Sequence, residues 1–214
     1  MDDFSTIVRF FQEGGVFMYF ILLLFAVGLA IAIERFIYLS AAKNKSSKMW
    51  NGLVPLIQEG NFDQAVKFAA ESKASIAHML SYGLARIMER NQHRNEIETA
   101  MEEGLMEVIP RLEKRTHYLA TLANIATLMG LLGTIIGLIQ AFTAVASADP
   151  SQKAELLSSS ISVAMNTTAF GLMAAIPLLL MHAFLTTKTT ELVDSFEMAA
   201  VKFLNLITKS DNAG

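Results

Sequence analysis

Two long stretches of this chain contain no Asp, Glu, Lys or Arg. They run from Tyr118 to Ala148 and from Leu156 to Thr187. At a rise of about 1.5 Å per residue, each would form roughly 46–48 Å of helix, whereas the hydrocarbon core of a bilayer is about 30 Å thick. A third charge-free stretch, from Val16 to Ile33, just meets the length for one crossing. The sequence therefore predicts an all-α integral membrane protein with three transmembrane helices.

Composition supports a membrane protein and argues against several other classes. Hydrophobic residues make up 53% and charged residues only 17% of the 214 residues, a balance too apolar for an ordinary soluble domain. Asp2 and Asp3 replace the positive segment that opens a cleavable signal peptide, so we expect the first span to remain in the mature protein. The net charge of −3 argues against a nucleic-acid partner, and without cysteine there is no disulfide and no thiolate metal site.

The distribution of Lys and Arg predicts the orientation of the spans. Basic residues gather after the first span, before the second and after the third, whereas the N-terminal segment has only Arg9 and the loop between the second and third spans only Lys153. Because cytoplasmic flanks carry the excess of basic residues, we expect a periplasmic N-terminus and a cytoplasmic C-terminus in a bacterial inner membrane. The predicted segments are an external N-terminal segment (1–15), transmembrane helix 1 (16–39), a cytoplasmic helical module (40–117), transmembrane helix 2 (118–148), an external loop (149–155), transmembrane helix 3 (156–187) and a cytoplasmic C-terminal helix and tail (188–214).

The cytoplasmic module is predicted to be helical with three interruptions. Asn44–Ser47, together with Asn51 and Gly52, suggests a loop; Gly60-Asn61 suggests a helix boundary, and Ser72–Ser75 a second break.

Helical spacing also extends beyond the second and third spans. From about Asn95 it runs straight into the second span, with a kink expected at Pro110. After the third span it continues to about Ile207. The two extensions leave the bilayer together and should pack side by side.

The second and third spans each carry small and polar residues at three- and four-residue spacing, which places them on one stripe of a helix. Small residues inside a membrane permit close helix packing, and Gly133 with Gly137 forms a small-xxx-small pair of that kind. Polar side chains around a water-filled passage would produce a similar pattern. Two matching stripes favour a shared polar cavity, with packing alone as the alternative. The stripes comprise Thr127, Gly130, Thr134, Gly137, Ala141 and Ala144 in the second span, and Ala164, Thr168, Gly171, Ala175 and His182 in the third.

Three consecutive polar residues, Asn166, Thr167 and Thr168, lie in the middle of the third span. A membrane Thr commonly returns its hydroxyl to the preceding turn of its own helix. Three adjacent polar side chains are costly to expose to lipid, so some of them should face protein or water. Pro177 should bend this span, and His182, near its cytoplasmic end, is expected to be solvated or interfacial.

Neither of these two spans contains a carboxylate. A proton path usually needs a group that binds and releases protons, which the hydroxyls of Thr134 and Thr168 cannot do at physiological pH. The missing acid should therefore come from a partner.

The most specific runs of the two spans are Gly130-Leu-Leu-Gly-Thr-Ile-Ile-Gly137 and Thr168-Ala-Phe-Gly-Leu-Met-Ala-Ala-Ile-Pro177. They resemble the GLxGTVxG and TAxGLxxAIP runs of the MotA/TolQ/ExbB proton-channel family, and within it the three-span ExbB/TolQ branch. The resemblance covers most of the chain and its motifs together are highly specific. Further support comes from Gly14-Gly15 with Met18, from Glu34-Arg35 and from Pro110-Arg-Leu-Glu113.

The resemblance implies a homopentamer around a pair of single-span helices from an ExbD/TolR-like partner, whose membrane Asp binds the proton. Thr134 and Thr168 match the family's pore-facing threonines. The chain departs from the family's pattern at Val163, where Glu is common, and at Thr127, where Pro is common; Val163 removes a candidate proton-entry acid on the outer side. Glu34-Arg35 matches a family hallmark, which we interpret as a juxtamembrane ion pair that snorkels to the interface.

These observations predict the channel-forming subunit of an inner-membrane ion-driven motor, not an enzyme, that energises outer-membrane transport or envelope processes. We expect no cofactor, H⁺ as the transported ion, membrane lipid around the spans and a TonB/TolA-like protein as a further partner. Na⁺ stays open as the ion, because hydroxyl and carbonyl oxygens suit it as well. Two alternatives also stay open: a self-contained channel or transporter that needs no partner, and a structural membrane scaffold in which the stripes serve packing alone.

Overall fold

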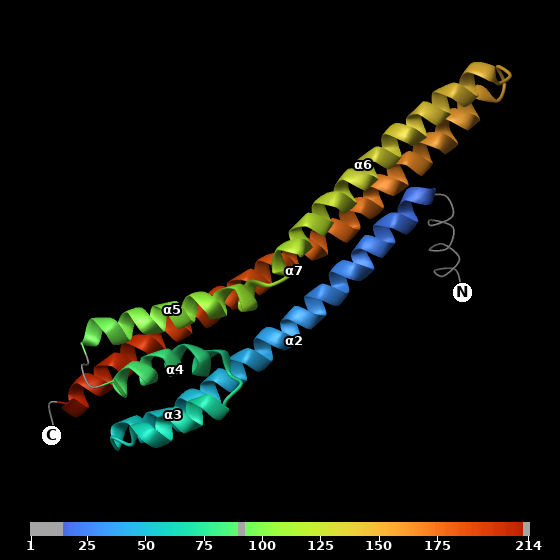
Figure 1. Ribbon diagram of the computed structural model, residues 1–214. Coiled ribbons are helices and arrows are strands. Elements are labelled where there is room, and N and C mark those ends of the chain that lie inside the picture. Colours follow the sequence, from blue (N-terminus) through green and yellow to red (C-terminus); the bar gives the residue numbers. More distant parts are fainter. Residues whose placement is uncertain (1–14, 90–92, 212–214) are drawn as a thin grey trace, which may run out of the picture. The chain divides into compact units, whose positions relative to one another are not determined.

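The computed structural model describes residues 15–89 and 93–211 (Figure 1). This part of the chain forms α-helices and contains no β-strand, which confirms the predicted all-α class. Nearly all of the predicted external segment 1–15, including Gly14, lies outside the described residues. The helices are α2 (Val16–Gln58), α3 (Phe62–Glu71), α4 (Ser75–Ile87), α5 (Arg94–Glu113), α6 (Thr116–Ser147) and α7 (Lys153–Asp211).

Three helical segments of the described chain are long and apolar enough to cross a membrane, as predicted. They lie within Val16–Gln58, Arg94–Ser147 and Lys153–Thr208. Length and composition therefore make this a multi-pass membrane protein. The chain divides into two compact units, the first with residues 15–34 and 115–184 and the second with residues 35–114 and 185–211.

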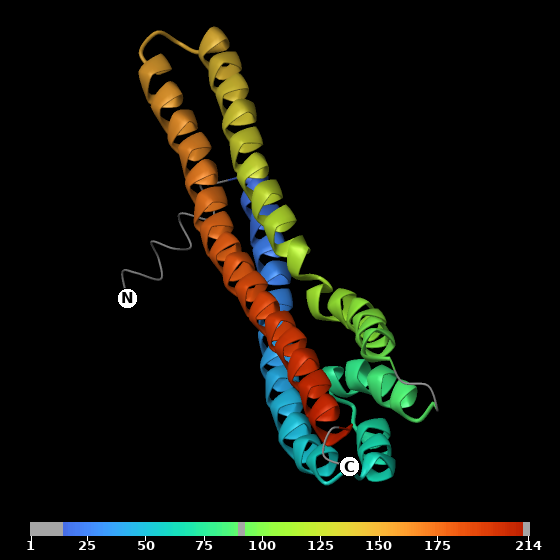
Figure 2. The ribbon, with the colours of Figure 1, turned by 90° about the vertical axis from the view of Figure 1, so that its left-hand side faces the viewer.

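The first unit consists of α6 and α7 with the beginning of α2. α6 and α7 are antiparallel, joined by the short segment 148–152, and run side by side in both ribbon views (Figures 1 and 2). A small core takes one buried residue from each helix: Ile21, Ala126 and Ala174. α2 also approaches α7 closely, because a Cβ atom added to Gly28 would lie 2.6 Å from a methyl group of Leu178.

Helix α2 continues without interruption to Gln58, so the loop predicted at Asn44–Ser47, Asn51 and Gly52 was wrong. Buried residues recur through this stretch at three- and four-residue spacing, which is the pattern of one helix face. Of the polar residues that suggested a loop, Asn44, Ser47 and Asn51 occupy the exposed face of the same helix, whereas Ser46 lies on the buried one. The buried face consists of Leu39, Ala42, Ser46, Met49, Leu53 and Ile57.

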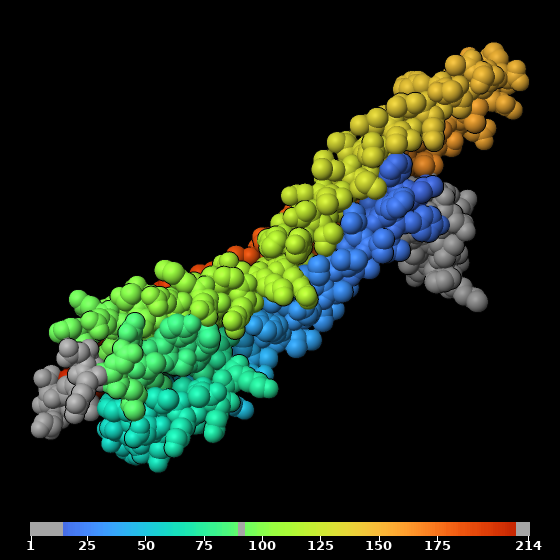
Figure 3. All heavy atoms as spheres, viewed as in Figure 1, coloured from blue at the N-terminus to red at the C-terminus, as the bar shows by residue number. Residues whose placement is uncertain are grey.

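The second unit contains α3, α4 and α5 with the ends of α2 and α7. Both boundaries predicted before α3 and α4 are confirmed. Gly60 has a φ of +71°, and the side chain of Asn61, the N-cap of α3, accepts a hydrogen bond from the N–H of Gln64 at 3.3 Å. Atoms of α3, α4 and α5 form one continuous packed surface in Figure 3. Arg94 of α5 donates to Asn205 of α7 at 3.1 Å, which agrees with the predicted packing of these helices.

The helix predicted to run from Asn95 into the second span is two helices. α5 ends at Glu113 and α6 begins at Thr116, while Pro110, where a kink was predicted, lies inside α5. The break comes at Arg115, whose φ of 67° is a left-handed conformation that costs a non-glycine residue about 1–2 kcal/mol. Tertiary contacts must therefore hold this residue in place.

Candidate functional site

Glycines bring the backbones of α6 and α7 into direct contact. A Cβ atom added to Gly130 would lie 3.2 Å from the Cα of Thr168, and one added to Gly171 would lie 2.8 Å from the carbonyl oxygen of Ala126. Because the neighbouring atoms belong to the backbone, the helices would have to separate to admit a larger residue. Inside a membrane such contact is a main source of helix association.

The same close approach continues along α6 toward its end. A Cβ atom at Gly133 would meet the methyl group of Thr167 at 2.4 Å, and one at Gly137 would meet the Cβ of Ala164 at 2.9 Å. We refer to Gly130, Gly133, Gly137 and Gly171 together as the α6–α7 seam. The structure thus places the small residues of the two predicted stripes against each other.

The hydroxyl of Thr168 connects the two helices at this seam. Its Oγ1 donates to the carbonyl oxygen of Gly130 at 2.8 Å, and the residue is half-buried. A hydrogen bond between two membrane helices stabilises their packing by roughly 0.5–2 kcal/mol. Thr168 therefore has a structural contact within the chain in addition to any role toward an ion.

The other predicted threonines bond within their own helices. Thr134 donates to the carbonyl of Leu131 at 2.6 Å. Thr127 and Thr167 return their hydroxyls to the carbonyls four residues earlier, at 3.1 and 3.0 Å. Thr134 is half-buried and follows Gly133, whose added Cβ would meet Thr167, so Thr134 lies within about one helical turn of Thr168 along the seam. A hydroxyl that donates in this way keeps acceptor capacity for another donor.

The remaining predicted residues of α7 differ in exposure. Asn166 is half-buried, between exposed Met165 and buried Thr167, and Ala175 is fully packed. Pro177 lies inside α7, which continues through it as one helix.

His182 is half-buried, with its Nδ1 3.0 Å from the carbonyl oxygen of Thr116. A carbonyl can only accept, so Nδ1 is the protonated donor in this contact. The sequence had suggested a solvated or interfacial ring. In the structure the ring connects α7 to the first turn of α6, and its position at the membrane interface stays a prediction.

Glu34 and Arg35 do not form the predicted ion pair with each other. Consecutive residues of a helix point about 100° apart, and here each side chain has its own partner. Glu34 pairs with Arg115 at 2.9 Å, with about half of each side chain exposed. Arg35 is 2% exposed, donates to the carbonyl oxygen of Leu112 and lies over the ring of Tyr38. Of the two, Arg35 is an internal structural residue.

Gly28 and Arg115 are contact residues that the sequence reasoning missed. An apolar helix with a glycine offered a signal for Gly28, since a small residue in a span commonly marks a close helix contact. Arg115 offered none, because a left-handed residue in a loop is usually Gly or Asn. Within residues 15–89 and 93–211, no cluster of three or more His, Asp or Glu residues could hold a metal ion.

Large apolar side chains cover the outward faces of the α6–α7 pair. Leu128, Ile139 and Phe142 of α6 are each at least 60% exposed, and Met165 and Leu180 of α7 likewise. A surface this apolar fits lipid or another membrane helix. The geometry defines a class of protein. It is a multi-pass α-helical membrane protein with a tight, glycine-packed helix pair and threonine hydroxyl groups beside the glycine contact.

Comparison with known proteins identifies the family within this class. Residues 71–198 match the MotA/TolQ/ExbB proton channel family. An ExbB homolog of Methanothermobacter thermautotrophicus is 29% identical over 91% of this chain and 68% of its own length. An ExbB-like protein of Synechocystis is 31% identical over 87% of this chain and 73% of its own length. TolQ of the Tol-Pal system of Haemophilus influenzae is 31% identical over 45% of this chain and 42% of its own length. The chain belongs to the MotA/TolQ/ExbB proton channel family and is of the ExbB/TolQ type.

Proposed function

We propose that this chain is the channel-forming subunit of a proton-driven motor in the bacterial inner membrane, with a periplasmic N-terminus and a cytoplasmic C-terminus. It couples proton flow to mechanical work on a single-span ExbD/TolR-like partner that carries a membrane Asp. The single observation that carries this proposal is the proximity of Thr134 and Thr168 on two packed spans, Tyr118–Ala148 and Leu156–Thr187, that have hydroxyls but no carboxylate.

The proposed assembly is a homopentamer. Membrane helices that expose small or polar groups beside apolar ones associate through those groups, and closed rings are the usual result of repeated contacts between identical chains. In such a ring, the exposed apolar residues of α6 and α7 would contact neighbouring copies and lipid. The half-buried hydroxyl of Thr134 would then face the partner helices along the axis.

In the proposed cycle the partner's Asp alternates between two protonation states at the threonine level. When it is ionised, the hydroxyl of Thr134 turns from the carbonyl of Leu131 and donates to the carboxylate. When it is protonated, it becomes the donor, and the bond from Thr134 to Leu131 forms again. The neutral acid can move past the apolar residues beside Thr134, whereas the ionised one cannot.

The membrane potential supplies enough energy for this movement. One elementary charge that crosses 100 mV releases about 2.3 kcal/mol, so a few protons can drive a rotation or repacking of helices against the partner. A TonB/TolA-like protein would carry the work to outer-membrane transport or envelope processes. Flux measured in H⁺ and in Na⁺ gradients identifies the ion.

Thr134→Val tests the proposal because valine has a similar shape and lacks the hydroxyl. The Thr134 hydroxyl bonds only within α6 in the described structure, so this change leaves the contact between Thr168 and Gly130 intact. Thr143→Val is the matched control: its hydroxyl also returns to its own helix, at 2.8 Å from the carbonyl of Ile139. In vesicles that contain chain and partner, we expect proton flux to fall at least tenfold in Thr134→Val and to stay unchanged in Thr143→Val.

The two alternatives predict other results in the same assay. A self-contained channel would give full flux when the chain is reconstituted without the partner. A structural scaffold would give the same activity for Thr134→Val and the parent chain. Either result would reject the motor proposal.

A further inference from the structure

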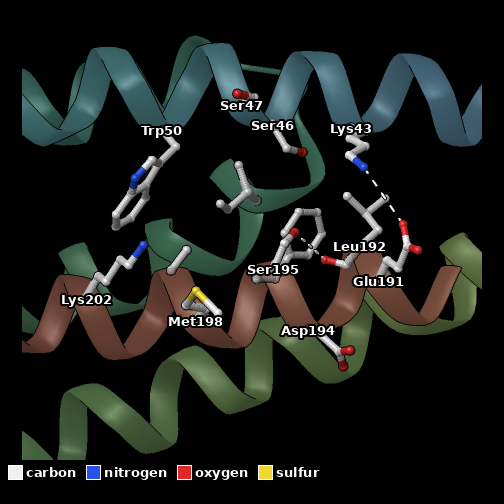
Figure 4. A pocket seen from close by; sticks show the side chains of 13 residues that line it. Lys43, Ser46, Ser47, Trp50, Glu191, Leu192, Asp194, Ser195, Met198 and Lys202 are labelled. Carbon is white, nitrogen blue, oxygen red and sulfur yellow. Dashed lines mark hydrogen bonds and ion pairs between the residues drawn. The ribbon is translucent and has the colours of Figure 1, made fainter. Parts of the chain in front are cut away.

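The second unit contains a cavity of about 480 Å³ between α2 and α7, with α4 behind it. This volume is within the range of small-molecule sites. Its walls are mainly apolar, with Leu192, Phe196 and Met198 from α7 and Ile76 from α4. Trp50 of α2 closes one end (Figure 4). Such a cavity suits a ligand with an apolar body.

Ser46 gives the cavity an unsatisfied polar group. The residue is 4% exposed, and its Oγ has no hydrogen-bond partner among the described residues. Figure 4 shows its side chain directed into the space between α2 and α7. Buried hydroxyls are nearly always paired, because an unpaired one costs stability. The position of Ser46 therefore indicates a ligand that accepts a hydrogen bond.

The charges around the cavity favour a single negative charge on that ligand. Lys43 and Glu191 offset each other in a long, exposed ion pair of 3.9 Å at one end. Asp194 also lines the cavity, with its carboxylate on the far side of α7 from Trp50, whereas the ammonium group of Lys202 turns toward Trp50 (Figure 4). Lys202 forms no ion pair with any described residue. The positive charge of Lys202 beside Trp50 is thus unpaired, although the lining as a whole is balanced.

We propose that this cavity binds a small amphiphilic anion, with its apolar body against Trp50 and Met198 and its anionic group held by Lys202 and Ser46. The inference is independent of the proposed motor function, because it concerns residues of the second unit alone. Free fatty acids and anionic phospholipids both combine an apolar chain with an anionic group. The test below separates these two sources.

Trp50 is the single tryptophan of the chain, so its fluorescence reports on this cavity directly. The full chain is placed in nanodiscs and titrated with 12-bromododecanoate, whose bromine quenches tryptophan on contact. We expect saturable quenching. A cationic probe of equal chain length, 12-bromododecyltrimethylammonium, should bind at least tenfold more weakly. If nanodiscs built from bromine-labelled phosphatidylglycerol quench Trp50 without added acid, the natural source is the membrane.

Two variants examine the polar contacts. Lys202→Gln should weaken binding of 12-bromododecanoate about tenfold, whereas Lys67→Gln, an exposed lysine that does not line the cavity, should leave it unchanged. Ser46→Ala should weaken binding about fivefold without lowering the Tm of the ligand-free protein, because the change removes an unpaired buried hydroxyl. Quenching that does not saturate, equal binding of the two probes, or equal binding by Lys202→Gln and Lys67→Gln would overturn the proposal. Absence of quenching because another copy of the chain covers Trp50 would also overturn the proposal.

Discussion

The hydroxyl of Thr168 donates to the carbonyl of Gly130, 2.8 Å away, at the point where α6 and α7 are in backbone contact. The hydroxyl of Thr168 can reach this carbonyl because Gly130 has no side chain that would hold the two helices apart. The motif that carries Thr168 and the motif that carries Gly130 belong to one structural element, which explains why the sequence places small and polar residues together in both spans.

Gly171→Val should lower the stability of this helix pair. The new side chain would begin 2.8 Å from the carbonyl of Ala126, and overpacking of this kind costs about 1–3 kcal/mol. Ala169→Val is the control, since Ala169 lies two residues earlier on the exposed side of α7. Thermal unfolding of the purified protein should show a lower Tm for Gly171→Val alone. Equal Tm values would mean that the helices can separate at little cost.

Arg35→Ala should destabilise the protein by roughly 2–4 kcal/mol, because it removes a buried charged donor and leaves the carbonyl of Leu112 without it. Glu34→Ala, at the preceding position, removes a half-exposed ion pair and should cost about 0–1 kcal/mol. Denaturant unfolding of the two variants measures the difference. Similar losses would contradict the separate roles assigned to these neighbours.

The conformation of Arg115 leads to a third prediction. Its φ of 67° strains any residue with a Cβ atom, so Arg115→Gly should exceed Arg115→Ala in stability by about 1 kcal/mol, although both lose the ion pair with Glu34. The comparison needs only the difference between their unfolding free energies. A more stable alanine variant would show that this backbone is not left-handed in solution.

Glu107 should make the contact between α4 and α5 sensitive to acid. His78 and Tyr82 each donate a hydrogen bond of 2.7 Å to its carboxylate, and these bonds lower the pKa of Glu107 below its ordinary value of 4.5. A carboxylate with a lowered folded-state pKa stabilises the fold above its unfolded-state pKa, and this contribution is lost as pH falls through the folded-state value. Stability should therefore decline below about pH 4.5.

Glu107→Gln removes this titration, so the Tm of the variant should depend less on pH between pH 6 and pH 3. Glu102→Gln, an exposed position on the same helix, serves as the control. Thermal unfolding followed by circular dichroism across this range measures both. A pH dependence that is the same in the two variants would exclude Glu107 as its source.

Some helix boundaries follow from local chemistry and could be predicted. Gly60 and Asn61 carry their signal in the chain itself, as a left-handed turn residue and an N-cap. The spacing of Leu39, Met49 and Leu53 also indicated that α2 continues to Gln58. The polar residues between them were interpreted as a loop instead. Periodicity was the better guide there.

Other features depend on contacts that no local pattern records. Arg115 adopts a conformation that its own side chain disfavours, and its ion-pair partner Glu34 is 81 residues away. Thr168 could have bonded to its own helix, as Thr167 does, and only the proximity of Gly130 decides otherwise. The stripes placed small and polar residues on one side of each span and left a cavity and packing open, whereas the contacts at the glycines and the direction of each hydroxyl required the structure.

The backbone contact at Gly130 and Gly171 also constrains how this chain can evolve. Alanine is the smallest change available to a glycine, and the seam has no room for its methyl group without a shift of the helices. The outward apolar residues of α6 can exchange one hydrocarbon for another in small steps. Substitutions that leave the helix pair intact are therefore expected at the outward apolar residues, and a change at the glycines would also move the threonines that lie beside them.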